Sequence, residues 1–163
     1  MNPAELHLAL NHFPVFGAVF VALLLVWGLM RRSRDVMRAA LGLTVLVSIG
    51  SYVAVATGEK AEHYVEDAAW FDEAIAHDHE ELGELAFKAM LVTGLIGLIG
   101  LWQLRGDREP KPLWPAITLV ALLISTGLVG WAAAKGGQIR HEEIRAGAVS
   151  PGPATLDVDE DSD

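Results

Sequence analysis

The chain has 163 residues, 52% of them hydrophobic, and its excess of acidic over basic residues gives a formal net charge of −9. This length suits one domain. The sequence contains no cysteine, which excludes disulfides, thiolate-ligated iron–sulfur clusters and covalently attached c-type haem.

The N-terminal segment predicts a helix start. Asn2 is a typical N-cap residue, Pro3 takes the first helical position, and Glu5 lies three residues after the cap. A helix from Pro3 to Met30 would be about 40 Å long, which exceeds the hydrocarbon core of a bilayer. We therefore expect its first turns to lie in the membrane interface.

Four apolar runs predict four transmembrane helices, because a bilayer core needs about 20 mostly apolar residues in a helix. The predicted spans are residues 10–30, 39–58, 85–104 and 113–134. The first span is not expected to be a cleavable signal peptide, since the segment MRRSR follows it where small residues would be needed. We predict an all-α, four-helix up-down transmembrane bundle over residues 1–145.

The loops predict the orientation of the bundle. Seven of the twelve basic residues lie in the loops that follow the first and third spans: Arg31, Arg32, Arg34, Arg38, Arg105, Arg108 and Lys111. By the positive-inside rule these loops are cytoplasmic. We expect a multi-pass protein of the bacterial inner membrane, with both termini and all six histidines on the outer side.

Two further segments complete the predicted organisation. Residues 59–84 form an acidic connection on the outer side, and their apolar spacing predicts helical extensions or a short interfacial helix. Residues 146–163 are acidic and contain Pro and Gly, which predicts a disordered tail. The sequence shows no convincing internal repeat.

Histidines and carboxylates lie close to the outer end of every predicted span. An up-down bundle brings these ends together, so side chains from all four helices can converge on one site. The candidates are His7 and His12 before the first span, Glu59 and Glu62 after the second, His79 and Glu80 before the third, and Arg140, His141 and Glu143 after the fourth. His12 is the favoured ligand because it adjoins the apolar run, where an unpaired polar group costs free energy.

Two kinds of cofactor fit such a set. A b-type haem needs two imidazoles on opposite sides of its ring, for which His12 with His79 or His141 are the first choice, with His7 as a further candidate and Arg140 for a propionate. A Cu, Zn or Fe ion would instead use three or four ligands. These would come from His12, His79, His141, Glu59, Glu62, Glu80 and Glu143. His63 and His77 lie in an acidic stretch and are expected to be solvated.

The same residues give the chain a resemblance. It is similar to a family of uncharacterised bacterial integral membrane proteins with four spans. The matching elements are Leu6-His7, Asn11-His12-Phe13-Pro14, Gly58 to Glu62, His79-Glu80, and Ile139 to Glu143. The resemblance implies a four-span membrane fold and carries no activity.

The leading hypothesis is electron transfer with an outer-side or membrane redox partner, through a b-type haem or a His/carboxylate-bound transition metal. The alternative is a non-catalytic membrane subunit or docking protein whose His/Glu rim is structural or binds a partner. Either way we expect an electron carrier or complex subunit rather than an enzyme, in a lipid bilayer, as a homo- or hetero-oligomer, with no nucleic acid bound.

Overall fold

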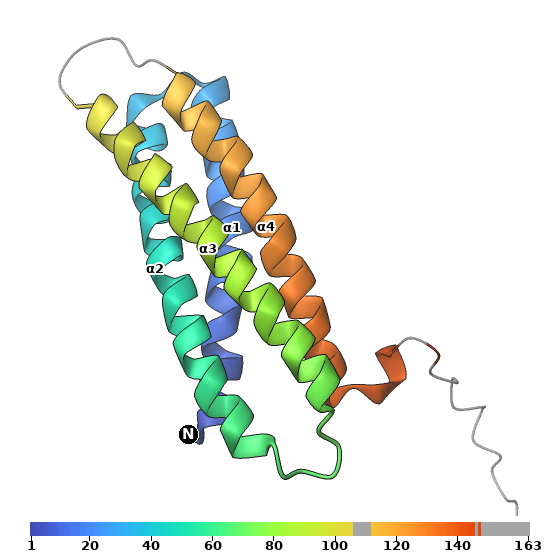
Figure 1. Ribbon diagram of the computed structural model, residues 1–163. Coiled ribbons are helices and arrows are strands. Elements are labelled where there is room, and N and C mark those ends of the chain that lie inside the picture. Colours follow the sequence, from blue (N-terminus) through green and yellow to red (C-terminus); the bar gives the residue numbers. More distant parts are fainter. Residues whose placement is uncertain (106–111, 146, 148–163) are drawn as a thin grey trace, which may run out of the picture.

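Four long helices form an up-down bundle (Figure 1). The computed structural model describes residues 1–105, 112–145 and 147. The helices are α1 (Pro3–Met30), α2 (Arg34–Val65), α3 (Glu73–Gln103) and α4 (Leu113–Arg140), followed by a short 3-10 helix, η1 (Glu142–Ile144). The predicted all-α bundle is confirmed. The predicted disordered tail lies outside the described residues, except for Gly147.

Polar side chains fix three of the helix starts. The Asn2 side chain accepts a hydrogen bond from the backbone N–H of Glu5 at 2.8 Å, and the Glu5 carboxylate accepts one from the Asn2 N–H at 3.1 Å. Ser33 caps α2, and Asp72 caps α3 by accepting from the N–H of Ile75 at 3.2 Å. These bonds satisfy N–H groups that have no partner inside the helix.

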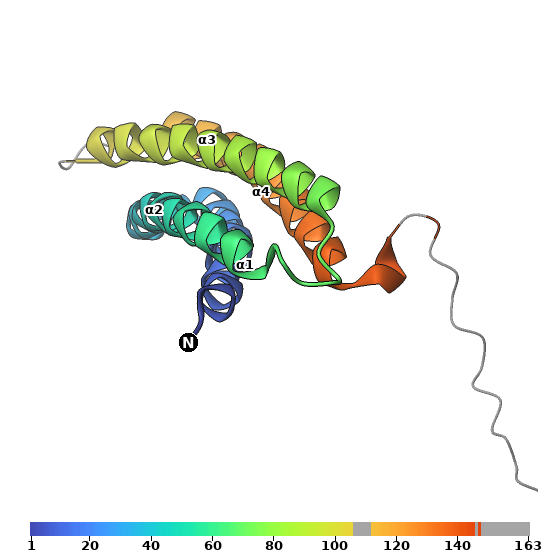
Figure 2. The same ribbon diagram turned by 60° about the horizontal axis from the view of Figure 1, so that its bottom comes forward.

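The helices pair as two hairpins. α1 packs along α2 and α3 packs along α4, while contacts between α2 and α3 and between α1 and α4 close the ring. Figure 2 shows the two hairpins as two layers. In this ring α1 and α3 lie on one diagonal and α2 and α4 on the other, and the contacts across the centre of the bundle are between α2 and α4.

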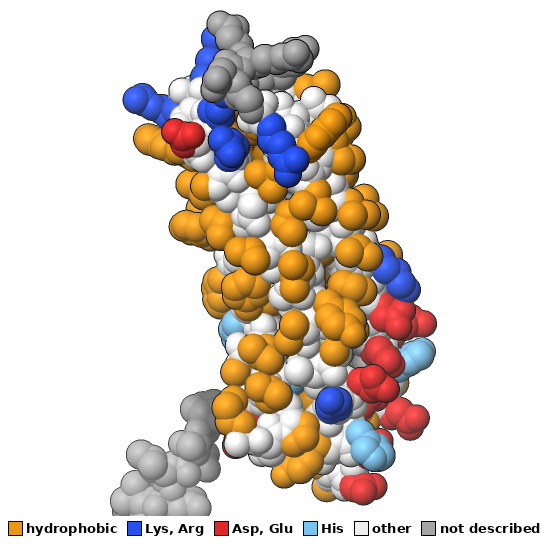
Figure 3. Space-filling view, turned by 90° about the vertical axis from the view of Figure 1, so that its left-hand side faces the viewer, with side chains coloured by type: hydrophobic (Ala, Val, Ile, Leu, Met, Phe, Trp, Pro, Cys, Tyr) orange, Lys and Arg blue, Asp and Glu red, His pale blue; other side chains and the backbone are white. Residues whose placement is uncertain are grey.

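The surface divides into three zones along the bundle (Figure 3). Basic side chains gather at the end that holds the α1–α2 loop, with Arg31 and Arg32; we name it the arginine end. All six histidines lie at the opposite end, which we name the histidine end. Between them the surface is hydrophobic, with large exposed side chains such as Phe20, Leu23 and Leu98.

This apolar middle zone identifies the environment of the protein. All four helices are long and apolar enough to cross a membrane. Exposing so large an apolar surface to water would cost free energy, whereas lipid tails solvate it. The chain is a multi-pass integral membrane protein.

Small and hydroxyl side chains hold the helices together inside this zone. A Cβ atom added to Gly94 on α3 would lie 2.5 Å from Oγ of Ser48 on α2, and the Ser48 hydroxyl donates to the Met90 carbonyl at 3.0 Å. Thr93 and Ser125 link α3 to α4 through their hydroxyls at 2.9 Å. Close approach and interhelical hydrogen bonds of this kind stabilise helix packing in membranes.

The two hairpins bury equivalent positions. Each buried residue of α1 has a buried counterpart in α3 after a shift of 72 residues: Pro14 and Ala86, Ala18 and Met90, Val21 and Thr93, Ala22 and Gly94, Leu25 and Gly97, Gly28 and Gly100. A shift of 78 residues relates five of the eight buried residues of α2 to buried residues of α4: Met37 and Pro115, Ala40 and Thr118, Thr44 and Leu122, Val47 and Ser125, Ser51 and Val129. Only one of these eleven pairs consists of identical residue types, Gly28 and Gly100. The repeat is therefore visible in the structure and not in the sequence.

Candidate functional site

Two histidines meet across the diagonal at the histidine end. His7 of α1 and His79 of α3 are both half-buried, and their ring centroids lie 6.4 Å apart with an interplanar angle of 73°. The two residues are related by the same shift of 72 residues that relates the buried positions of α1 and α3. The pair therefore brings equivalent positions of the two hairpins together.

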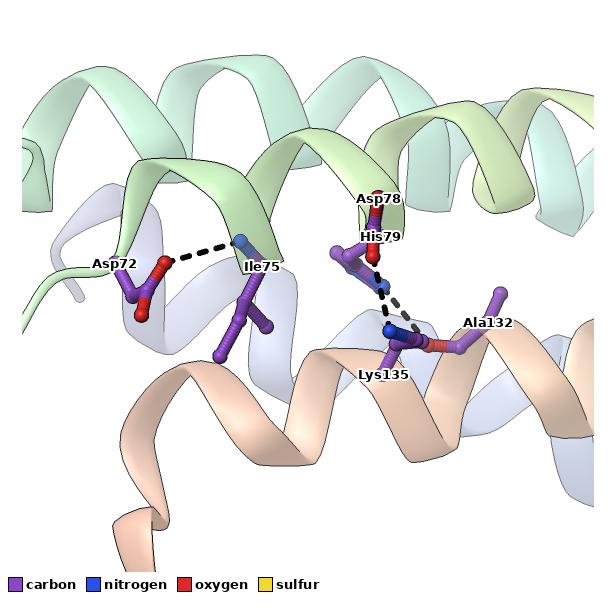
Figure 4. A network of polar contacts seen from close by, with 6 residues as sticks. All are labelled: Asp72, Ile75, Asp78, His79, Ala132 and Lys135. Atoms are coloured by element: carbon purple, nitrogen blue, oxygen red, sulfur yellow. Dashed lines mark hydrogen bonds and ion pairs between the residues drawn. The ribbon is translucent and has the colours of Figure 1, made fainter. Parts of the chain in front are cut away.

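A backbone carbonyl of the neighbouring helix fixes each ring. Nδ1 of His7 donates to the Ala54 carbonyl on α2 at 3.1 Å, and Nδ1 of His79 donates to the Ala132 carbonyl on α4 at 2.8 Å (Figure 4). A carbonyl can only accept, so each Nδ1 carries the hydrogen. In a neutral imidazole the other nitrogen, Nε2, then holds a lone pair that can bind a metal. The Thr57 hydroxyl oxygen lies 3.3 Å from the same Nδ1 of His7.

A glycine gives each ring its space. A Cβ atom added to Gly58 would lie 3.3 Å from Cε1 of His7, and one added to Gly136 would lie 2.8 Å from Cε1 of His79. Each glycine stands four residues after the alanine whose carbonyl accepts the hydrogen bond. The shift of 78 residues relates both alanines and both glycines, so the site consists of two equivalent half-sites. We name the His7 and His79 half-sites by their histidines.

His12 lies on another face of α1. Its side chain is exposed, its Nδ1 donates to the Leu8 carbonyl of its own helix at 2.6 Å, and its ring stacks on Phe16 with centroids 6.0 Å apart. The predicted partners of His12 are therefore not beside it here: His79 faces His7 instead. A ligand role for His12 stays a prediction.

The candidates that follow α4 pair with their local neighbours. Nδ1 of His141 lies 2.8 Å from a carboxylate oxygen of Glu143, and both side chains are exposed. Hydrogen bonds from its own backbone and from His141 lower the pKa of the Glu143 carboxyl. The Arg140 guanidinium lies over the Trp70 ring, 4.9 Å from its centroid, which anchors the end of α4 to the α2–α3 connection.

The remaining carboxylate candidates do not gather around the histidine pair. Glu59 and Glu80 are exposed and Glu62 is half-buried. Within the described residues no group of three or more His, Asp or Glu side chains is placed to hold a metal ion. His63 pairs with Glu66 at 2.9 Å and His77 with Glu81 at 3.5 Å, all on exposed side chains.

Neither the carbonyls nor the glycines that hold the two rings were predicted from the sequence. The signal was present as an Ala followed four residues later by a Gly, which occurs at Ala54–Gly58, at Ala132–Gly136 and, one residue on, at Ala133–Gly137. The flanking residues differ, so the two segments do not stand out as a repeat. Only the pairing of each segment with a histidine of the preceding helix marks it.

The fold defines the class of this protein as a four-span integral membrane protein, and a pair of histidine rings lies near one end of its bundle. Searches among known protein families, characterised proteins and solved structures find no match to the chain. The resemblance drawn from the short motifs is supported as far as its four-span architecture.

Proposed function

We propose that this protein is a membrane electron carrier that holds a b-type haem between His7 and His79. One observation carries the proposal: two imidazoles from diagonal helices meet in an edge-to-face arrangement with ring centroids 6.4 Å apart, and each donates its Nδ1 hydrogen to a carbonyl. That arrangement leaves both Nε2 atoms as ligands and orients the rings before any ligand binds. Such hydrogen bonds also raise the basicity of a ligating imidazole.

The number of ligands favours haem over a bare metal ion. A Zn, Cu or Fe ion takes three or four protein ligands, whereas a haem supplies its own equatorial nitrogens and needs axial ligands alone. With a metal–nitrogen distance of about 2 Å, two imidazoles on opposite sides of one metal atom have ring centres about 6 Å apart. The centroids of His7 and His79 are 6.4 Å apart.

The distribution of charge gives the proposed orientation. Arginines gather at one end and the histidine pair lies at the other, so the positive-inside rule puts the site on the outer side of a bacterial inner membrane. One haem at that end exchanges electrons with an outer-side or membrane partner. All six histidines lie at the histidine end, so the other end offers no imidazole for a second bis-histidine haem.

A second candidate function follows from the same hydrogen bonds. The His7 bond ties α1 to α2, and the His79 bond ties α3 to α4. The pair can thus act as a clamp in a non-catalytic membrane subunit. If the pair binds haem, replacing either histidine removes the haem and leaves the fold. If the pair is a clamp, no haem is bound and replacing either histidine impairs the fold.

The test is an absorption spectrum of the purified protein after haem-supplemented expression, oxidised and then reduced. We expect a Soret band and sharp reduced bands with one haem per chain. His7→Ala and His79→Ala should abolish the bands, while His12→Ala and His141→Ala should keep them. Size-exclusion profiles control for folding. A colourless wild-type protein, or haem retained in the His7→Ala/His79→Ala double variant, would overturn the proposal.

A further inference from the structure

The two half-sites differ in the groove that lies against each. The groove of the second hairpin has a volume of about 420 Å³ and is lined by Asp78, Glu81, Leu82, Leu85, Trp131 and Lys135. The groove of the first hairpin, which includes Leu6 and Thr57, measures about 150 Å³. Ligand pockets for small molecules span about 300–1,000 Å³. Only the larger of these two grooves reaches that range.

The repeat shows which features belong to the second groove alone. By the shifts of 72 and 78 residues, Asp78 occupies the position of Leu6, and Lys135 occupies the position of Thr57. Trp131 likewise corresponds to Val53. Of the residues that line the first groove, only Leu6 and Thr57 correspond to residues of the second, namely Asp78 and Lys135. The first hairpin therefore shows these two positions without the ion pair, and it has a valine where the second has the indole ring.

The groove is ordered by polarity along the bundle. Asp78 and Lys135 lie nearest the histidine end and form an ion pair at 2.9 Å (Figure 4), with the Lys135 side chain 29% exposed. Leu85 and Trp131 lie one to two turns deeper, toward the apolar zone. A ligand that fits this order has a polar head directed to the histidine end and an apolar body in the membrane.

The groove also adjoins the His79 half-site. Asp78 precedes His79 in α3, and Trp131 precedes Ala132, whose carbonyl accepts the His79 hydrogen bond. Residues that line the groove are thus the chain neighbours of the residues that form the His79 half-site. No corresponding charged pair flanks His7 among the described residues.

We propose that this groove binds the head ring of a membrane quinol. The choice of a redox-active ligand rests on the proposed function. A neutral ring suits a groove whose two carboxylates outnumber its one ammonium, because an anionic headgroup would meet net negative charge. The indole of Trp131 offers a face for stacking, Lys135 donates to a quinone oxygen, and Asp78 or Glu81 accepts from a quinol hydroxyl.

The redox balance of the pairing is simple. A quinol that becomes a quinone loses two electrons and two protons. A haem held by His7 and His79 would supply one-electron chemistry, so one quinol would reduce two molecules of the protein. The carboxylates of Asp78 and Glu81 accept the protons and release them to water at the histidine end.

The test uses tryptophan fluorescence in lipid nanodiscs with a short-chain benzoquinone as the quenching ligand. One variant keeps Trp131 and has phenylalanine at the other four tryptophans; a matched variant keeps Trp102, which is exposed at the arginine end. We expect saturable quenching for Trp131 and linear, unsaturable quenching for Trp102. Replacing Asp78 and Lys135 by their counterparts from the first hairpin, Asp78→Leu/Lys135→Thr, should weaken the saturable binding about tenfold or more.

The outcomes separate this inference from the proposed function. Repeating the titration in the His7→Ala background reads quinone binding without bound haem. Saturable quenching in this variant, together with a wild-type protein that contains no haem, would overturn the haem proposal and support the quinol site. Unsaturable quenching of Trp131, binding unchanged by Asp78→Leu/Lys135→Thr, or complete displacement by a zwitterionic phospholipid would overturn the quinol site.

Discussion

At the residue scale, the position of each imidazole depends on a neighbouring glycine, which has no side chain to occupy the space of the ring. Gly136 leaves the space into which Cε1 of His79 fits, and a Cβ atom there would come within 2.8 Å. Gly58 does the same for His7 with more room, at 3.3 Å. Real Cβ contacts below about 3 Å force a neighbour to move, so the two glycines should respond differently to the same change.

We predict that Gly136→Ala destabilises the protein while Gly58→Ala is close to neutral. Overpacking costs about 1–3 kcal/mol, whereas alanine in a helix interior gains about 0.5–1 kcal/mol over glycine. The first effect dominates at Gly136, and the two nearly cancel at Gly58. Thermal unfolding in detergent measures both.

The matched control for these variants is Gly127→Ala, because no atom lies within 4 Å of a Cβ placed there. It should be neutral or slightly stabilising. If Gly136→Ala unfolds at the same temperature as Gly127→Ala, the His79 ring does not depend on this glycine. A lower melting temperature for Gly136→Ala alone supports the packing argument.

The sequence could place histidines at one end of the bundle but not choose among them. His7 and His12 lie on the same helix, and α1 is apolar on all sides, so hydrophobic periodicity does not show which face turns inward. His12 was favoured as a ligand because its polar ring lies beside the apolar run, where it needs a hydrogen-bond partner or a ligand. In the structure that polarity is satisfied locally by the Leu8 carbonyl, an interaction that spacing alone does not reveal.

At the element scale, helix ends at the histidine end are tied together by side chains from the segment after α4. Arg145 donates to the Gln138 and Ile139 carbonyls at 2.8 and 2.9 Å, and its guanidinium lies 3.5 Å from Asp72. Asp72 also caps α3. One carboxylate thus serves both the start of α3 and its connection to the end of α4.

We predict that the two roles of Asp72 separate by substitution. Asp72→Ala loses the cap and the ion pair, and the cap alone is worth about 1 kcal/mol. Asp72→Ser keeps a capping oxygen and loses the charge. Hydrogen exchange should therefore speed up in the first turn of α3 for Asp72→Ala more than for Asp72→Ser.

The control for the ion pair is Arg145→Ala, which leaves the Asp72 cap in place. It should raise exchange at the end of α4 and leave the first turn of α3 unchanged. Equal exchange of that turn in Asp72→Ala and Asp72→Ser would show that the cap contributes nothing measurable. The ion pair itself is only half-buried and is expected to contribute little, since solvent partly screens it.

The helices themselves were predictable from sequence because long apolar runs, a capping box and basic loops are local signals. α1 begins and ends at the predicted Pro3 and Met30. The helical spacing in the acidic connection predicted helical extensions or a short interfacial helix, and in the structure α2 extends to Val65 and α3 begins at Glu73. The diagonal placement of α1 and α3 is a tertiary property that such signals do not contain.

At the scale of the whole molecule, the equivalence of the two hairpins explains where a site can form. The shift that relates the buried positions of α1 and α3 also relates His7 to His79, so the two hairpins bring equivalent imidazoles together. Two such imidazoles can share one ligand. Where the halves differ, as at Asp78 and Lys135 against Leu6 and Thr57, the groove of the second hairpin is the larger.

The last prediction concerns how the whole bundle sits in its membrane. The chain contains no cysteine, so a single introduced thiol reports the side of the membrane without background. His63 lies at the histidine end with 84% of its side chain exposed, and Asp35 is exposed at the arginine end. Asp35→Cys removes no basic residue, so it leaves the orientation signal intact.

In intact bacterial cells with a permeabilised outer membrane, an impermeant maleimide should label His63→Cys at once and Asp35→Cys only after lysis. The reverse pattern would place the histidine pair on the cytoplasmic side, and with it any partner that exchanges electrons there.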